Sequence, residues 1–149
     1  MITFLFAGGK TEPDLDSAFS HYLAKLNKIS DSKVIFINSR ETSPEKIKKD
    51  ESDKILKNIA KNSLTILFDE TGKVGDSLEY AKVIESSPYS DLSIIIGGSY
   101  GVSDEIKARS QRIISFGRMV FPHQLARLMA IEQTYRAILI NKGSDYHHK

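Results

Sequence analysis

The sequence contains no cysteine, and this absence excludes disulfide bonds, thiolate zinc sites and cysteine nucleophiles together. It also lacks an apolar stretch that could cross a bilayer, because the longest runs, 2–7 and 92–96, fall far short of the roughly 20 residues that a spanning helix needs. No basic segment precedes the first apolar run, so it predicts a strand and not a signal peptide. We therefore expect a cytoplasmic protein.

Length and composition are typical of one globular domain. The chain has 149 residues, of which 40% are hydrophobic and 27% are charged, and these fractions indicate a folded rather than a disordered protein. No internal repeat, low-complexity tract or linker interrupts the sequence. We therefore expect a single domain over residues 1–149.

The net charge of +2 is too small to indicate nucleic-acid binding by itself. Its distribution is uneven: residues 107–149 hold eight Lys/Arg and two Asp/Glu, a local net charge of +6, which leaves −4 for residues 1–106. Such asymmetry predicts that one end of the protein meets a polyanion. A solvated basic helix face explains it equally well.

Apolar periodicity predicts alternating strands and helices along the whole chain. Largely apolar runs, typical of strands buried on both faces, occupy residues 2–7, 34–37, 64–68 and 92–96, and residues 112–115 are expected to form a fifth, shorter strand. Helical spacing, proline starts and capping residues predict helices that begin near Pro13, Pro44, Asp76, Ser103 and Pro122. This alternation predicts an α/β fold with a mostly parallel sheet flanked by helices.

Three segments carry more specific expectations. The helix after Pro44 has few apolar residues among many charges, so we expect it at the rim of the fold. Residues 69–75 contain two glycines and predict a loop. The last helix should bury the face that carries Leu125, Leu128, Met129, Glu132, Tyr135 and Leu139.

Three loops are expected at one edge of the sheet, where ligands of parallel sheets bind. They follow Phe68, Ile96 and Ser115. The most informative is 97–101 (Gly-Gly-Ser-Tyr-Gly), because glycine allows positive φ and a close approach of backbone N–H groups to a ligand. It matches neither a P-loop nor the dinucleotide fingerprint, and a plain strand-to-helix turn explains it about as well.

The loop 116–121 (Phe-Gly-Arg-Met-Val-Phe) is unusually apolar for a loop. Apolar loop residues line flat aromatic ligands such as adenine, and they also serve packing or oligomer contacts. His123, at the start of the last helix, is more often a cap or surface group than a catalyst. Glu132 needs a partner on that helix, and Arg136, one turn on, is the expected one.

Four segments, in this order and at these separations, resemble the RlmH family: residues 94–101, 115–124, 131–137 and the terminal pair Tyr146-His147. That family comprises SPOUT-class methyltransferases of pseudouridine N3 in large-subunit ribosomal RNA. The resemblance runs the whole length of the chain and is strongest from Leu92 onward. Ser52 stands where a glycine is usual and Phe68 where leucine is usual; only Phe68 is near the expected ligand.

The resemblance implies a SPOUT-type fold with a C-terminal trefoil knot that holds S-adenosyl-L-methionine (SAM). It implies these cofactor-binding residues: Phe68, Gly97, Phe116, Gly117, Arg118, Met119, Val120 and Phe121. No metal is expected, because attack on an already activated methyl group needs alignment rather than a metal or a covalent intermediate.

The resemblance also implies a homodimer in which the tail of one subunit reaches the cofactor of the other. Tyr146, His147 and Arg136 are the catalytic candidates. His147 is the group best matched to removing the N3 proton, Tyr146 would stack on or hydrogen-bond the target base, and Arg136 would hold a phosphate or a carboxylate.

The expected partners are large-subunit rRNA, in the assembled ribosome, and a second copy of the chain, without a membrane. Two alternatives stay open: a SPOUT methyltransferase of another RNA, and a non-catalytic RNA-binding SPOUT protein. The intact glycine loop and the terminal Tyr-His pair argue against the second. A flavodoxin-type nucleotide-binding protein is disfavoured by the apolar loop 116–121.

Overall fold

All strand pairings in the computed structural model are parallel. The structure describes residues 1–10 and 12–148, and over these residues the strands are β1 (Ile2–Ala7), β2 (Ser32–Ile37), β3 (Ser63–Val74), β4 (Asp91–Ile96) and β5 (Arg112–Ser115). They form one sheet in the order β2-β1-β4-β3-β5. The predicted α/β class with a mostly parallel sheet is confirmed.

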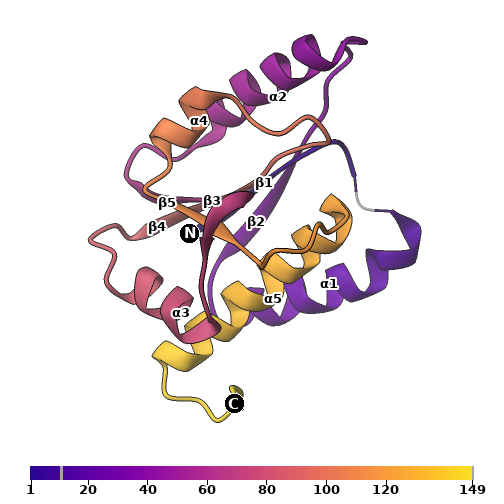
Figure 1. The fold of residues 1–149 in the computed structure, drawn as a ribbon. Coiled ribbons are helices and arrows are strands. Elements are labelled where there is room, and N and C mark those ends of the chain that lie inside the picture. The colour runs from indigo at the N-terminus through magenta and orange to yellow at the C-terminus, as the bar shows by residue number, and fades with distance from the viewer. Residues whose placement is uncertain (11, 149) are drawn as a thin grey trace.

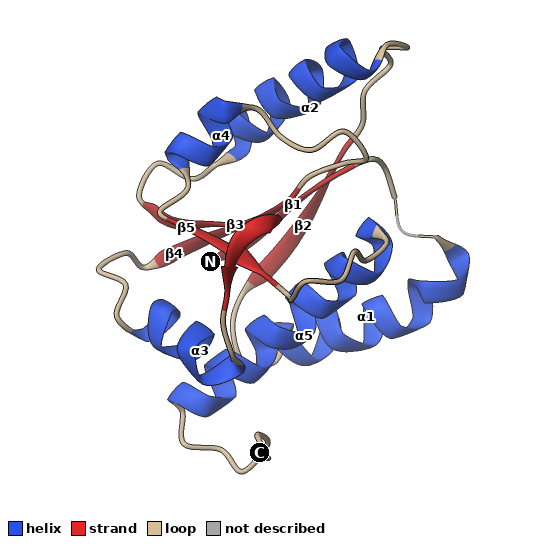
Figure 2. Ribbon diagram, viewed as in Figure 1, coloured by secondary structure: helices blue, strands red, loops and turns tan. Residues whose placement is uncertain are grey.

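Helices cover both faces of this sheet (Figures 1 and 2). One face is covered by α1 (Pro13–Asn27), α3 (Ser77–Glu85) and α5 (His123–Asn141), the other by α2 (Pro44–Asn58) and α4 (Asp104–Arg109). Neighbouring residues of β1 therefore enter different cores: Phe4 and Phe6 pack on the α1/α3/α5 side, Leu5 and Ala7 on the other. Within the described part of the chain, no helix is both long and apolar enough to cross a membrane.

Most residues of helix α2 are exposed or partly exposed, as its charged sequence predicts, but the helix also buries polar residues. Ile55 is fully buried in the core on that side, and Glu51 and Ser52 are buried beside it. The hydroxyl of Ser52 accepts a hydrogen bond from the Ser103 N–H at 3.0 Å. The serine that replaces a usual glycine therefore ties α2 to the start of α4.

Residues 69–75 do not form a loop, and that prediction is wrong. Strand β3 continues to Val74 and pairs with β5 again after a register shift between Phe68 and Lys73. A Cβ on Gly72 would lie 2.6 Å from the carbonyl carbon of Ile114. The glycine therefore allows two backbones to approach closely inside a strand, whereas its sequence context suggested a turn.

The core face of α5 also differs from the prediction. The buried residues of this helix are Gln124, Arg127, Ala130, Ile131, Thr134 and Ala137. The face expected to be buried, with Leu125, Leu128, Met129, Glu132, Tyr135 and Leu139, is only partly buried. Apolar residues thus lie on two sides of α5. Spacing alone pointed to the wrong side because the truly buried side carries three polar residues.

Candidate functional site

A cavity of about 420 Å³ lies between residues 68–70, in the middle of β3, and the loops that follow β4 and β5, the two neighbours of β3 in the sheet. Its volume falls within the roughly 300–1,000 Å³ that is usual for small-molecule sites. The expected cofactor residues that line it are Phe68, Gly97, Phe116, Gly117, Met119, Val120 and Phe121. Arg118 is exposed and is not among the lining residues that the structure describes.

The loop 116–121 is anchored at its start and exposed at its tip. The Ser115 hydroxyl donates to the Gly117 carbonyl at 2.7 Å and accepts from the Gly117 N–H at 3.2 Å, and Gly117 adopts a φ of 142°. The side chains of Met119 and Val120 are 78% and 80% exposed. Exposed apolar groups of this size at a cavity mouth indicate a surface that a ligand or a partner covers.

Two aromatic rings form a flat apolar wall of the cavity. Phe68 stacks on Phe116 with ring centroids 4.4 Å apart and planes 4° from parallel. Tyr80 packs edge-on against Phe68 at 5.6 Å. Phe68 therefore keeps the apolar surface that leucine would supply, in a form that suits stacking against a planar ligand.

The glycine loop 97–101 is constrained by its own packing. A Cβ on Gly97 would lie 2.9 Å from Val102 Cγ1 and 3.3 Å from the carbonyl carbon of Gly101. The Gly101 N–H donates to the Gly98 carbonyl at 3.0 Å, and Gly101 has a φ of 75°. From the sequence, these glycines are expected to allow the close approach of a ligand. At Gly97 the structure adds a second reason, because a side chain there would collide with Val102.

Sequence reasoning missed several polar residues of this cavity. Asp69 and Glu70 line it from β3, Ser99 from the glycine loop, and His123 from the start of α5. Burial and then repulsion by Arg127 lower the pKa of His123, so its imidazole is neutral at pH 7. In the sequence, the position of His123 at a helix start was its only distinguishing feature. Asp69 and Glu70 were missed because they lie in the segment that was expected to be a loop. Among the described residues, no group of three or more His, Asp or Glu side chains lies close enough to hold a metal ion.

The three catalytic candidates lie together around Glu132. The expected Glu132–Arg136 ion pair is confirmed, with Nη2 and Nε of Arg136 at 2.5 and 3.0 Å from Glu132 Oε1. The Tyr146 hydroxyl donates to the same oxygen at 3.3 Å, and Arg136 lies 4.8 Å from the centre of the Tyr146 ring. His147 Nδ1 is 3.5 Å from Arg136 Nη1.

Burial, followed by the negative charge of Glu132, raises the pKa of Tyr146 to about 12, against the opposing charge of Arg136. The hydroxyl of Tyr146 is therefore protonated at neutral pH. It can donate a hydrogen bond but cannot act there as a base.

Within one chain, this tail cluster (Glu132, Arg136, Tyr146 and His147) is separated from the 420 Å³ cavity. Ala126 is the last residue of α5 that lines the cavity, and Arg136 follows it by ten positions, about 15 Å along the helix at 1.5 Å per residue. Neither Tyr146 nor His147 is among the described lining residues. A single subunit does not bring the two halves of the expected site together.

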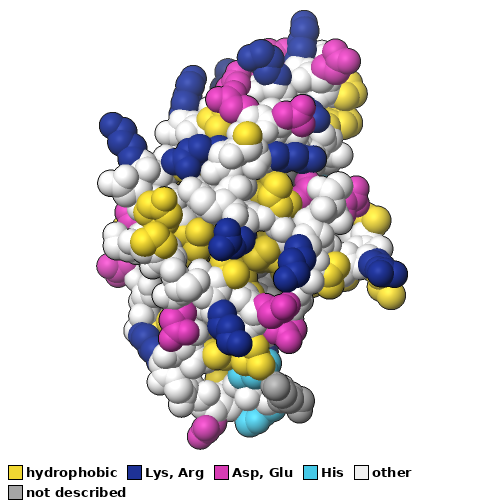
Figure 3. All heavy atoms as spheres, turned by 60° about the vertical axis from the view of Figure 1, so that its left-hand side comes forward, with side chains coloured by type: hydrophobic (Ala, Val, Ile, Leu, Met, Phe, Trp, Pro, Cys, Tyr) yellow, Lys and Arg dark blue, Asp and Glu magenta, His cyan; other side chains and the backbone are white. Residues whose placement is uncertain are grey.

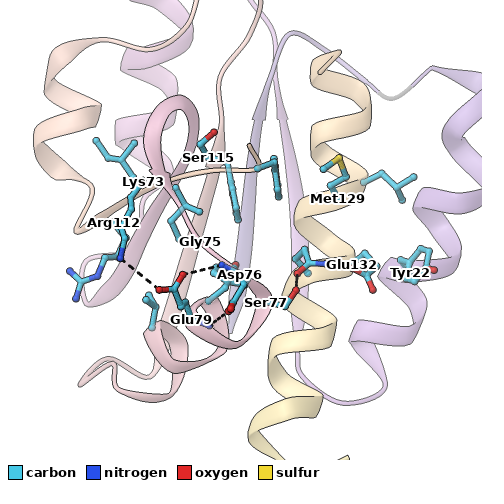
Figure 4. Close-up of a pocket in the computed structure, with 18 residues that line it drawn as sticks. Tyr22, Lys73, Gly75, Asp76, Ser77, Glu79, Arg112, Ser115, Met129 and Glu132 are labelled. Carbon is cyan, nitrogen blue, oxygen red and sulfur yellow. Dashed lines mark hydrogen bonds and ion pairs between the residues drawn. The ribbon is translucent and has the colours of Figure 1, made fainter. Parts of the chain in front are cut away.

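A second cavity of about 630 Å³ lies between β3, α3, β5 and α5 (Figure 4). In Figure 4, Lys73 and Glu79 face each other at 3.8 Å, and Ser77 points to α5, where it donates to Gln133 at 2.6 Å. Of the expected cofactor residues, only Phe68 and Phe116 line this cavity. We therefore assign the smaller cavity as the candidate cofactor site.

Fewer unpaired positive charges of residues 107–149 reach the surface than the sequence suggests. Arg127 is fully buried and Arg136 is paired with Glu132. On the face shown in Figure 3, Lys and Arg side chains alternate with Asp and Glu. That face does not form a continuous basic surface, and the predicted polyanion contact gains no support from it.

A comparison with protein-family models matches residues 1–147 to a family described as "Predicted SPOUT methyltransferase". The chain belongs to the SPOUT methyltransferase family. Relatives of this SPOUT chain include proteins named Ribosomal RNA large subunit methyltransferase H from Enterococcus faecalis and Clostridium acetobutylicum, 37% and 36% identical over 157 residues. Each comparison covers 98% of both chains, and the resemblance to the RlmH family is confirmed.

Two solved structures share the fold of this SPOUT chain at low sequence identity. A methylase family protein from Haemophilus influenzae has a TM-score of 0.58 at 11% identity, covering 99% of this chain and 70% of that one. A methyltransferase from Legionella pneumophila, solved with bound SAM, has a TM-score of 0.51 at 15% identity, covering 94% and 66%. At these low identities, the TM-scores show a common fold and carry no information about the ligands of this chain.

Proposed function

We propose that this protein is a SAM-dependent methyltransferase that methylates N3 of a pseudouridine in large-subunit ribosomal RNA, acting as a homodimer. The observation that carries the proposal is the convergence of the expected cofactor residues on one cavity of a SPOUT chain. The names of the relatives support the RNA substrate, and the SAM bound to the Legionella pneumophila methyltransferase supports the cofactor.

The residues of the 420 Å³ cavity fit such a cofactor. The stacked rings of Phe68 and Phe116 offer a flat apolar wall for adenine, and the exposed side chains of Met119 and Val120 are placed to cover it. The carboxylates of Asp69 and Glu70 suit ribose hydroxyls or a cationic group. The cofactor supplies an activated methyl group, and the cavity supplies its alignment.

The tail cluster supplies the groups that the target base needs. In the proposed reaction, His147 takes the N3 proton of the base. The protonated hydroxyl of Tyr146 donates a hydrogen bond to a ring carbonyl. Arg136, held by Glu132, stabilises the negative charge that the ring gains as it loses the proton.

A homodimer joins the two halves of the site. Because the tail cluster is separated from the cavity along α5, the proposal brings the tail of one subunit to the cavity of another. The partly exposed face of α5, with Leu125, Leu128 and Met129, gives a second copy an apolar surface to cover. A sedimentation mass near 16.7 kDa at micromolar concentration, rather than about twice that value, would contradict the dimer.

The proposal also includes a trefoil knot, formed by the chain after Ile96. It further includes a single domain over residues 1–149 and action on rRNA in the cytoplasm. Proteolysis tests the domain: one core should resist cleavage from near the first residue to α5. Two stable fragments would contradict it.

Methyl transfer tests the function directly. Large ribosomal subunits from a strain without the modification, incubated with the protein and labelled SAM, should gain one methyl group on a pseudouridine, located by mass analysis of nuclease fragments. Transfer to a different RNA instead would favour the SPOUT enzyme of another substrate. SAM binding without transfer to any RNA would favour the non-catalytic alternative.

A further inference from the structure

Arg127 is the largest side chain that the described structure buries completely. Its Nη1 donates to the Gly9 carbonyl at 2.9 Å and to Gln124 Oε1 at 3.3 Å, and its Nη2 donates to the Ala7 carbonyl. The guanidinium also lies 5.8 and 5.9 Å from the ring centres of Phe6 and Phe36. Arg127 thus fastens the start of α5 to the end of β1.

Glu51, on α2, approaches the glycine loop from the other face of the sheet. The residue is 4% exposed, and a Cβ on Gly98 would lie 2.6 Å from its Oε2. Glu51 Oε2 and Arg127 Nε, an acceptor and a donor, are both buried without a hydrogen-bond partner among the described residues. Burial raises the pKa of the Glu51 carboxyl, and the Gly8 backbone N–H and the Arg127 charge oppose that rise.

Gly8 is the point at which these groups meet behind the cofactor cavity. A Cβ on Gly8 would lie 3.3 Å from Arg127 Nη2, 3.5 Å from His123 Nε2 and 3.7 Å from Gly98 Cα. His123 and Gly98 line the cavity, and Glu51 and Arg127 do not. The charges of the last two residues therefore lie directly behind its wall.

We propose that Glu51 and Arg127 are positioning residues of the cofactor site, which hold the glycine loop and the His123 ring in place without contacting the cofactor. This inference rests on the proposed function. It adds Glu51 of α2 and Arg127 on the core face of α5 to the residues of that site.

Packing alone does not call for charges here, because a buried ion costs solvation free energy that an apolar side chain of equal size would not. The N–H groups of Arg127 satisfy the carbonyls of Ala7 and Gly9 beside two glycines of positive φ. Its charge, after burial, also lowers the pKa of His123, while Glu12 opposes this and Asp69 and Glu70 line the same cavity. A neutral imidazole does not repel the positive sulfonium of SAM.

The substitution Arg127→Met tests the proposal, because it keeps an unbranched apolar stem and removes the charge and the donors of the guanidinium. We expect the affinity for SAM, measured by calorimetry, to fall about tenfold or more. Thr134→Val is the matched control: Thr134 is fully buried on the same helix, bonds to Tyr80 and Ala130, and lines neither cavity. It should lower the melting temperature and leave SAM affinity within about twofold.

A titration of His123 by NMR gives a readout that a purely structural role would not move. In the cofactor-free protein, Arg127→Met should raise the pKa of His123 toward its ordinary value, because repulsion by Arg127 is removed. An unchanged pKa of His123, or a loss of SAM affinity no larger than that in Thr134→Val, would overturn the proposal. Failure of the wild-type protein to bind SAM would instead overturn the proposed function, and the titration would still test the arrangement.

If Arg127→Met does not fold, the contact between Gly98 and Glu51 provides a second test. Gly98→Ala should weaken SAM binding about tenfold in the wild-type background, because its Cβ meets Glu51 Oε2. In a Glu51→Ala background the same substitution should cost little, since that oxygen is gone. Equal losses in the two backgrounds, measured as a double-mutant cycle, would show that Glu51 does not set the position of the loop.

Discussion

The two arginines of α5 differ in burial and in the partners of their side chains. Arg127, near the start of the helix, is fully buried, donates to the carbonyls of Ala7 and Gly9, and has no carboxylate within ion-pair distance in the described structure. Arg136, near the end, is partly exposed and pairs with Glu132 while it stacks on Tyr146. The first arginine belongs to the support of the cofactor cavity, and the second belongs to the tail cluster.

This contrast predicts that cofactor affinity and turnover can be changed separately. Substitutions at the cavity end of α5 should act on SAM binding, because that end lines or supports the cavity. Substitutions at the tail end should act on the rate of methyl transfer, because the tail meets the target base of a neighbouring subunit in the proposed dimer. A variant at one end with the effect expected of the other would break the comparison.

Deletion of residues 145–149 should have the largest effect of this kind. It removes Tyr146 and His147, so methyl transfer to large subunits should fall by about 10³-fold, within the range attributed to a lost acid–base group. Thermal stability and SAM affinity should change little, because neither residue lines the cavity in the described structure. Single-turnover rates and calorimetry on the same preparation measure the two quantities, and a deletion variant with wild-type turnover would remove both residues from the catalytic set.

Arg136→Ala should lower the turnover rate about 100-fold, a usual loss for a group that stabilises charge in the transition state. SAM affinity should stay unchanged. Lys142→Ala is the control, since Lys142 is an exposed cation at the same end of α5 whose side chain donates to the Ile29 carbonyl and does not contact the tail cluster through any hydrogen bond of the described structure. Equal losses in the two variants would point to general attraction of RNA by positive charge and not to a role for Arg136 in the site.

Gly97→Val should produce the opposite pattern at the cavity end. Its Cβ would lie 2.9 Å from Val102 Cγ1, so the loop must shift to relieve the overpacking. We expect this shift to lower SAM affinity roughly tenfold or more. The dimer should persist, because Leu125, Leu128 and Met129, the residues of the partly exposed face of α5, do not line the cavity that this loop forms. Calorimetry that shows unchanged SAM affinity would place the cofactor elsewhere, and the 630 Å³ cavity would then be the next candidate.

The central residues of the strands were predictable because buried parallel strands are largely apolar, and β5 spans the predicted residues 112–115. The capping box at Asp76 and the Ser103 cap were equally local signals, and both are present. The path of residues 69–75 was not predictable, because the close approach of Gly72 to Ile114 depends on a strand 40 residues away.

The candidate site shows the same limit. The Glu132–Arg136 pair followed from helical spacing, and the cofactor residues followed from the family resemblance. The positions of Glu51 and Arg127 did not, since they depend on α2 and α5 meeting at Gly8 from opposite faces of the sheet. The apolar spacing of α5 gave no signal for Arg127, because it marked a different side of the helix as the core face.

Phe68→Leu should give the smallest effect and sharpen the comparison at its cavity end. The substitution removes the stacked contact with Phe116 at 4.4 Å, and aromatic pairs contribute about 0.5–1.5 kcal/mol beyond their buried area. The loss should appear mainly as a slightly lower melting temperature, because leucine keeps the wall of the cavity apolar. SAM affinity should stay within about threefold of wild type, and turnover at saturating SAM should not change, since the tail cluster is untouched. Phe68→Ser is the matched control: it removes the apolar wall as well as the ring, so it should weaken SAM binding well beyond threefold. If Phe68→Leu weakened SAM as much as Phe68→Ser, the aromatic ring of Phe68, and not only the apolar surface that leucine keeps, would be needed for contact with adenine.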